Sequence, residues 1–276
     1  MTILDLRPLS VGEILDRTFT LYRRNFKLFV GITALPQLIG LAASLARIFT
    51  LGNNNSRFSL ISIVALLASV LVLLLVSMYS QAASFLAVND LYLGRPVTAS
   101  DCLRRALDHI STVFVVTILT GLAVLAGAIF LIIPGIWIFC RLIVALPAAL
   151  IEQRVGSDAV SRSWHLTRDN AGRAFVIALL YFVIAIAAGM LFQLPLGIAV
   201  VVYRNNPAML QMWTAVSQVG EAIINILVTP IFMIATSVFY FDLRVRKEGF
   251  DLQMMLDPNS ERSTPPGTGS VPSILA

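Results

Sequence analysis

The 276-residue sequence is 58% hydrophobic and only 13% charged, and its mean hydropathy is +0.85. A soluble domain is typically ~45–50% apolar and ~25% charged. The apolar excess is more than one water-soluble core of this size can bury, so the composition excludes an ordinary soluble domain and predicts an all-α, polytopic membrane helical bundle. The net charge of +5 comes from basic residues that flank the apolar runs. This placement favours the lipid bilayer and anionic lipid headgroups as partners, rather than nucleic acid.

The N-terminal part of the chain predicts an interfacial helix followed by two membrane spans. Residues 10–27 are amphipathic, and Ser10 and Glu13 have the S-x-x-E spacing of a capping box. Apolar runs follow at 28–51 and 58–88, and each is longer than the ~20 residues that a helix needs to cross the hydrocarbon layer.

The middle of the chain repeats this plan with a tighter hairpin. A second amphipathic segment at 98–110 leads into a span at 111–133. Pro134-Gly135 is a strong turn signal, and a shorter apolar run follows it at 136–151. This last run either crosses the membrane, which gives six spans, or dips into it and returns, which gives five.

The C-terminal part holds the third copy of the plan and a tail. An amphipathic segment at 157–173 precedes spans at 174–202 and 216–241. Residues 251–276 end in Pro, Gly and Ser without hydrophobic periodicity. This composition predicts a disordered cytoplasmic tail behind an integral membrane domain that covers 1–250.

The basic residues decide between the two topologies. With six spans, sixteen of the 20 lysines and arginines lie on the inner side, and only Arg47, Arg57 and Arg204 lie toward the outer side. Five spans would place the basic run at 242–249 outside, against the positive-inside rule. We therefore expect six spans with both termini in the cytoplasm.

Three amphipathic helices, each followed by a helical hairpin, form an internal repeat that predicts a pseudo-threefold bundle. We expect the short helices to lie on the cytoplasmic surface, where their arginines bind lipid headgroups or a partner, or only anchor the spans behind them. These interfacial basic residues are Arg23, Arg24, Arg104, Arg105, Arg162 and Arg168.

Arg141 is the one charge predicted deep inside the membrane. It lies about 11 residues from Glu152, or roughly 16 Å along a helix, and an arginine near the bilayer centre costs at least ~2.5 kcal/mol. Gln37 has a similar expected depth in the first span, so the two residues form a candidate polar membrane site. Arg141 either lines a cavity that binds an anionic headgroup or solute, or it is a structural arginine satisfied by Gln37 and by carbonyls that prolines leave free.

Motifs for catalysis, cofactors or metals are missing from the sequence. It contains no GxSxG, HExxH, P-loop or dinucleotide motif. The two histidines, His109 and His165, fall beside arginines in the amphipathic segments, where solvated polar roles are expected. Cys102 and Cys140 are expected neither to pair nor to bind a metal. The sequence thus predicts no catalytic, cofactor-binding or metal-binding residue.

Four segments resemble the membrane domain of membrane-anchored glycerophosphoryl diester phosphodiesterases and of related stand-alone bacterial proteins. They are RPLSVGEILDRTFTLYRRNFKLF at 7–29, IPGIWIFCRLIVALPAALIE at 133–152, AVSRSWHLTRDN at 159–170 and YFDLRVRKEGFDL at 240–252. The resemblance implies a multi-helix protein of the bacterial inner membrane. It does not imply a hydrolase, because in fused relatives catalysis belongs to a soluble barrel domain that these segments do not contain.

These observations favour a non-enzymatic integral membrane protein, either a lipid-interacting scaffold or an accessory subunit for a membrane protein partner. The alternative is a transporter or channel for a small anionic solute or lipid headgroup, with Arg141 as its selective group and proline-broken helices near the midplane. A third interpretation, an intramembrane lipid-modifying enzyme, lacks a base or nucleophile with a partner.

Overall fold

The computed structural model describes residues 7–51 and 60–249, and these residues form helices without any strand. The helices are α1 Val11–Arg24, α2 Phe26–Leu51, α3 Leu60–Tyr92, α4 Ala99–Asp108, α5 Ile110–Phe130, α6 Ile132–Leu142, α7 Ala145–Ile151, α8 Ser157–Leu166, α9 Ala171–Val202 and α10 Pro207–Glu248. Six helical segments are long and apolar enough to cross a membrane, with α6 and α7 counted together. The all-α fold class is therefore confirmed, and the number of segments able to span a membrane agrees with the predicted six. The predicted tail at 251–276 and the turn that carries Arg57 lie outside the described residues.

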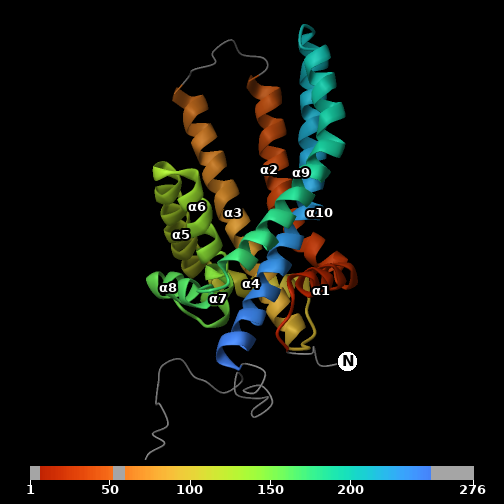
Figure 1. The fold of residues 1–276 in the computed structure, drawn as a ribbon. Coiled ribbons are helices and arrows are strands. Elements are labelled where there is room, and N and C mark those ends of the chain that lie inside the picture. The colour runs from red at the N-terminus through yellow and green to blue at the C-terminus, as the bar shows by residue number, and fades with distance from the viewer. Residues whose placement is uncertain (1–6, 52–59, 250–276) are drawn as a thin grey trace, which may run out of the picture.

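The short helices gather at one end of the molecule, which we call the basal end. Figure 1 shows α1, α4 and α8 at this end, together with the C-terminal part of α10. The hairpins α2/α3 and α9/α10 extend from it to the opposite, distal end (Figure 1). Along the chain a short helix precedes a hairpin three times, as expected, whereas a pseudo-threefold symmetry in space stays a prediction.

The first short helix begins with the predicted capping box. The Ser10 hydroxyl accepts a hydrogen bond from the Glu13 N–H at 3.3 Å, and the Glu13 carboxylate accepts one from the Ser10 N–H at 2.7 Å. These bonds, together with the nearby Arg7 guanidinium, lower the pKa of Glu13 to about 2. The helix ends at Asn25, whose backbone and side-chain amides both donate to the Leu21 carbonyl, and the chain then turns into α2. Capping at both ends therefore fixes a short surface helix before the first span.

Two predicted boundaries move for local reasons. The helical hairpin turns at Leu131 rather than at Pro134, because proline fits the first turn of a helix, where an N–H would have no partner. Helix α10 begins at Pro207, well before the predicted start at 216, and it is 42 residues long. Polar residues such as Gln211 lower the local hydropathy without ending the helix.

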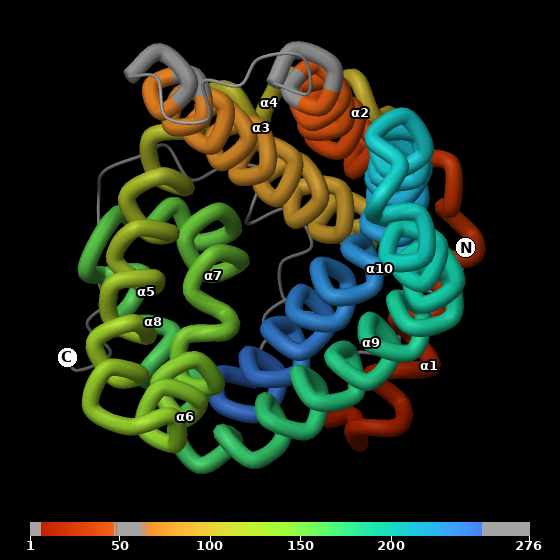
Figure 2. The backbone as a smooth tube through the Cα atoms, turned by 90° about the horizontal axis from the view of Figure 1, so that it is seen from above, coloured from red at the N-terminus to blue at the C-terminus, as the bar shows by residue number. Residues whose placement is uncertain are grey.

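Helix α10 organises the core. It packs against α1, α2, α3, α7, α8 and α9, and Figure 2 shows it running across the middle of the molecule with α9 along one side. Its residues from Ile231 to Leu243 are almost all buried. The buried core thus lies in the basal half, whereas apolar side chains on the outer parts of α3 and α9 are exposed, as expected for contact with lipid.

Small residues bring α5 and α6 together. A Cβ atom added to Gly135 would lie 2.9 Å from the Ala128 Cα, and one added to Gly127 would lie 3.2 Å from the Gly135 Cα. Real Cβ atoms essentially never approach backbone to 2.9 Å, so this helix contact requires glycine at 135, while a side chain at 127 would push its neighbours apart.

We predict that replacing Gly135 by alanine destabilises the protein by about 1–3 kcal/mol, the usual cost of overpacking a close contact. Thermal unfolding in detergent measures the change. Gly121 is a matched control on α5, since an added Cβ meets nothing there within 4 Å. G121A should leave the melting temperature unchanged or slightly raised, because it removes a glycine from a helix. Equal melting temperatures for the two variants would contradict this prediction.

Candidate functional site

A buried carboxylate at the basal end of α10 connects three distant parts of the chain. Asp242 is 2% exposed, and its carboxylate accepts from Arg173 Nη1 at 2.8 Å, from Arg246 Nε at 3.0 Å and from the Leu9 N–H at 2.7 Å. Both guanidiniums also donate to the Leu9 carbonyl at 2.6 Å. Asp242 therefore fixes the segment before α1 and the start of α9 against the last turns of α10.

A second carboxylate holds α7, α8 and α10 together. Glu152, the C-cap of α7, accepts from Arg162 Nε at 2.7 and 2.9 Å and from the Tyr240 hydroxyl at 2.9 Å. Arg162 also pairs with Glu248, and Arg154 Nε lies 2.8 Å from Glu152. The loop after α7 and the short helix α8 are thereby held against α10 by a connected ionic network.

The surroundings of Glu152 set its pKa. Burial alone raises the pKa of this carboxyl, but the hydrogen bond and charge of Arg162, with smaller effects from Tyr240 and Arg244, bring it below its usual value of 4.5. Burial lowers the pKa of Arg162, and its bonds to Glu152 and Glu248 more than reverse that effect. Both members of the pair are therefore charged at neutral pH, and the network is stable as an ion pair.

The six predicted interfacial arginines fall into two groups. Arg105 pairs with Asp90 at the end of α3, and Arg162 belongs to the network around Glu152. The other four are exposed, and no ion pair joins them to any residue in 7–51 or 60–249. They are Arg23, Arg24, Arg104 and Arg168. The first group holds helices together, whereas the second presents its charge to the surroundings of the basal end.

Arg141 lies against the short helix α8, and not beside Gln37 as predicted. Its guanidinium carbon is 4.5 Å from the Trp164 ring and 5.6 Å from the Trp137 ring, within the range of cation–π attraction. The residue is 7% exposed, and its Nε has no hydrogen-bond partner in the described part of the chain. Its backbone carbonyl accepts from two hydroxyls of α8 and its C-cap, those of Ser163 and Thr167, each at 2.9 Å.

The depth estimated for Arg141 assumed one continuous helix back to Glu152. The structure instead breaks that helix between α6 and α7, since Pro147 cannot donate to the carbonyl of Ile143. Gln37 lies on α2, which occupies a different side of the bundle from α6 in both views (Figures 1 and 2). The structure therefore does not bring the two candidate polar residues together.

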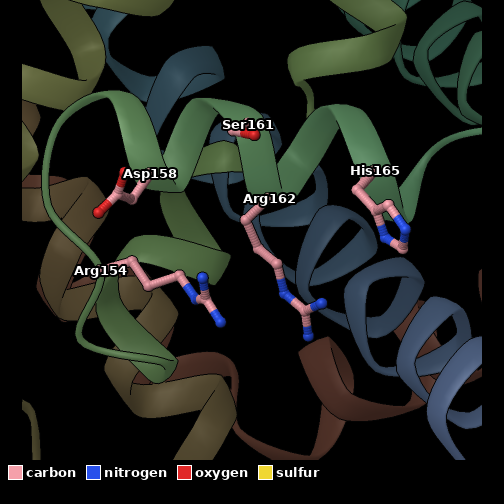
Figure 3. Close-up of a pocket in the computed structure, with 5 residues that line it drawn as sticks. All are labelled: Arg154, Asp158, Ser161, Arg162 and His165. Carbon is pink, nitrogen blue, oxygen red and sulfur yellow. The ribbon is translucent and has the colours of Figure 1, made fainter.

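An open pocket of about 360 Å³ lies beside α8. Its lining residues are Arg154, Asp158, Ser161, Arg162 and His165. Figure 3 shows the Arg154, Arg162 and His165 side chains on one side of the helix, with Asp158 near its start. Their chemistry suits an anion such as a phosphate, although both arginines are already held by Glu152.

The described residues contain no group of three or more His, Cys, Asp or Glu side chains able to hold a metal ion. Cys102 and Cys140 are both buried and unpaired. Burial is also the main reason why the pKa of the Cys102 thiol is raised, which disfavours its thiolate form.

The residues around these ionic clusters also carry the similarity to known proteins. Residues 120–264 match the membrane domain of glycerophosphoryl diester phosphodiesterase. The chain belongs to this family. The match covers just over half of the chain and includes Arg141, Glu152 and Asp242, and it confirms the resemblance seen in the sequence. Neither a curated protein nor a solved structure matches the chain. This member of the family is a multi-pass membrane protein.

Sequence reasoning missed the two carboxylates that hold the basal end of this family member. Glu152 served only to estimate the depth of Arg141, and no role was predicted for Asp242. The available signal was an acidic residue directly after an apolar run, with arginines two and four residues later in DLRVR at 242–246. Its partners Leu9 and Arg173 are too far away in sequence for any local pattern to indicate them.

We predict that D242N destabilises the protein by about 3 kcal/mol or more, because it leaves two arginines without their buried counter-charge. Thermal unfolding in detergent at neutral pH measures the loss. Asp16 is an exposed acidic residue of α1, and D16N should change the stability by less than about 0.5 kcal/mol. A D242N variant as stable as D16N would show that the cluster does not hold the basal end together.

The lowered pKa of Glu152 predicts a pH dependence of stability. A carboxyl with a lower pKa in the folded than in the unfolded state stabilises the fold above the unfolded value of 4.5, and this contribution is lost as the pH falls through the folded pKa. E152Q should therefore be less stable than wild type at pH 7, and the difference should shrink below about pH 4.5. Melting temperatures from pH 3 to 7 test this. E221Q, at an exposed site on α10, should keep the wild-type profile; a constant gap between E152Q and wild type would contradict the prediction.

Proposed function

We propose that this chain is a non-enzymatic protein of the bacterial inner membrane that binds anionic lipid headgroups and acts as a lipid-interacting scaffold or accessory subunit. Its basal end would face the cytoplasm. The proposal rests mainly on the exposed arginines Arg23, Arg24, Arg104 and Arg168, which lie on the short basal helices or next to them.

The distribution of charge supports this orientation. The basal end holds three ionic clusters around Asp90, Glu152 and Asp242, and it also holds the four exposed arginines. Arg204 lies in the turn between α9 and α10 at the opposite, distal end. Basic residues are retained on the cytoplasmic side of bacterial membrane proteins, and the inner leaflet offers anionic headgroups to each exposed guanidinium.

The short helices also suit an interfacial position. On α1, Ile14 and Thr18 are buried against the protein, whereas Phe19 is exposed together with Arg23 and Arg24. An exposed aromatic ring beside exposed arginines matches the boundary between acyl chains and headgroups. On α8, Trp164 is likewise part exposed.

The geometry favours this function over transport through Arg141. The Arg141 guanidinium lies against two indole rings, and the pocket beside α8 is lined by neither Arg141 nor Gln37. We interpret Arg141 as a structural residue that joins α6 to α8. An R141L variant should therefore keep the lipid preference of the wild type.

The proposal is tested by replacing the four exposed arginines together. Native mass spectrometry of the detergent-solubilised protein, titrated with phosphatidylglycerol or phosphatidylcholine, compares the binding of anionic and zwitterionic lipid. We expect the R23Q/R24Q/R104Q/R168Q variant to lose its preference for phosphatidylglycerol. Each replaced arginine should lower the ratio of phosphatidylglycerol to phosphatidylcholine affinity about fivefold, since one basic residue contributes ~1 kcal/mol near an anionic surface.

The matched control replaces the same four residues by lysine, which keeps the charge. This variant should retain the preference for phosphatidylglycerol, and its sensitivity to salt should match that of the wild type. R204Q, at the distal end, should also behave as the wild type. An unchanged preference in the glutamine variant would overturn the proposed headgroup binding.

A further inference from the structure

The turn between α5 and α6 consists entirely of large apolar residues. Ile129, Phe130, Leu131, Ile132 and Ile133 are each between 65% and 83% exposed. From 121 to 136 the sequence contains only Gly, Ala, Val, Leu, Ile, Phe and Pro. An exposed apolar cluster of this size is unfavourable in water, so the tip of this hairpin requires an apolar environment.

The other two hairpins have polar turns. The sequence between α2 and α3 includes GNNNSR at 52–57, and YRNN at 203–206 joins α9 to α10. Asparagine, serine and arginine suit a turn that reaches water or headgroups on the far side of a membrane. The α5/α6 turn has no such residue, which sets this hairpin apart from the two that carry the polar turns.

The α5/α6 hairpin is also shorter than the others. At 1.5 Å per residue, the 21 residues of α5 extend about 31 Å, whereas the 32 residues of α9 extend about 48 Å. All of these hairpins start near the basal end, and Figure 1 shows the α5/α6 tip well below the distal ends of α2, α3, α9 and α10. The tip therefore lies at a level where the long helices still present apolar side chains.

The backbone of the turn tolerates an environment without water. The Leu131 N–H donates to the Gly127 carbonyl at 3.2 Å, and the Gly135 N–H donates to the Leu131 carbonyl at 3.3 Å. Pro134, in the first turn of α6, has no N–H. The turn therefore has one fewer N–H group that would lack a partner. A turn this compact reduces the unpaired backbone groups that would otherwise keep it out of hydrocarbon.

We infer that α5 and α6 enter and leave the bilayer from the basal side, and that their tip at 129–133 contacts lipid acyl chains without reaching the opposite surface. Four helices, α2, α3, α9 and α10, then cross the membrane completely. Because the hairpin returns to its own side, the N- and C-terminal ends of the described chain still lie on the same side. The inference does not depend on headgroup binding by the exposed arginines.

Depth measurement with spin labels tests this inference. Single cysteines are introduced into the C102A/C140A background at exposed positions along α5 and at the tip, namely Phe114, Ile118, Leu122, Leu125, Ile129 and Leu131. In reconstituted vesicles, the relaxation of each label by oxygen, which collects in hydrocarbon, is compared with its relaxation by a water-soluble nickel chelate. N205C marks the distal aqueous surface.

We expect the ratio of oxygen to nickel accessibility to rise continuously from Phe114 to Leu131, with its highest value at the tip. A helix that crosses the membrane would instead give a maximum near Leu122 and a fall toward the value of N205C at Leu131, and this result would overturn the inference. Low accessibility of Leu131 to both reagents would also overturn it, because it would mean that protein covers the tip. Size-exclusion chromatography and the melting temperature identify any labelled variant that fails to fold. The labels at neighbouring positions still define how accessibility changes along the hairpin.

Discussion

The carboxylate of Asp242 joins parts of the chain that are far apart in sequence, and the arrangement of the basal end depends on it. Its two oxygens are shared between the Leu9 N–H, Arg173 and Arg246. Buried charge is stable only when it is paired and hydrogen-bonded, and here both conditions are met by groups from three separate segments. The start of α1, the start of α9 and the end of α10 are thus tied at one point, from which the long helices extend into lipid.

The neighbouring network around Glu152 applies the same principle to α7 and α8. The helix breaks before α7, and α8 packs against Arg141 at the end of α6 through the Ser163 and Thr167 hydroxyls and the Trp164 ring. Apart from Arg141, which lies against two indole rings, the buried charges of these clusters are concentrated at one end and paired, while the exposed arginines remain available to the surroundings. One end of the molecule thus holds both the ionic clusters that join the helices and the exposed arginines.

Local sequence patterns predicted the helices well, because hydropathy and capping act over a few residues. The apolar runs, the S-x-x-E start at Ser10 and the three amphipathic segments all correspond to observed helices. Contacts between distant segments were not predictable in this way. Arg141 was paired with Gln37 by assuming a straight helix, whereas the break near Pro147 and the position of α8 are properties of the folded chain. The same limit hid the link between Leu9 and Asp242.

The length of α10 has a mechanical consequence. Its 42 residues form one continuous helix, about 63 Å long when measured along its axis, and Figures 1 and 2 show that its distal and basal parts run in different directions. Pro230 lies within it, yet the helix continues through that position. One end of the helix carries the turn after Arg204, and the other carries Asp242 and Glu248. A tilt imposed on the distal part, for example by a change in bilayer thickness, would therefore reach the ionic clusters at the base through this bent but continuous helix.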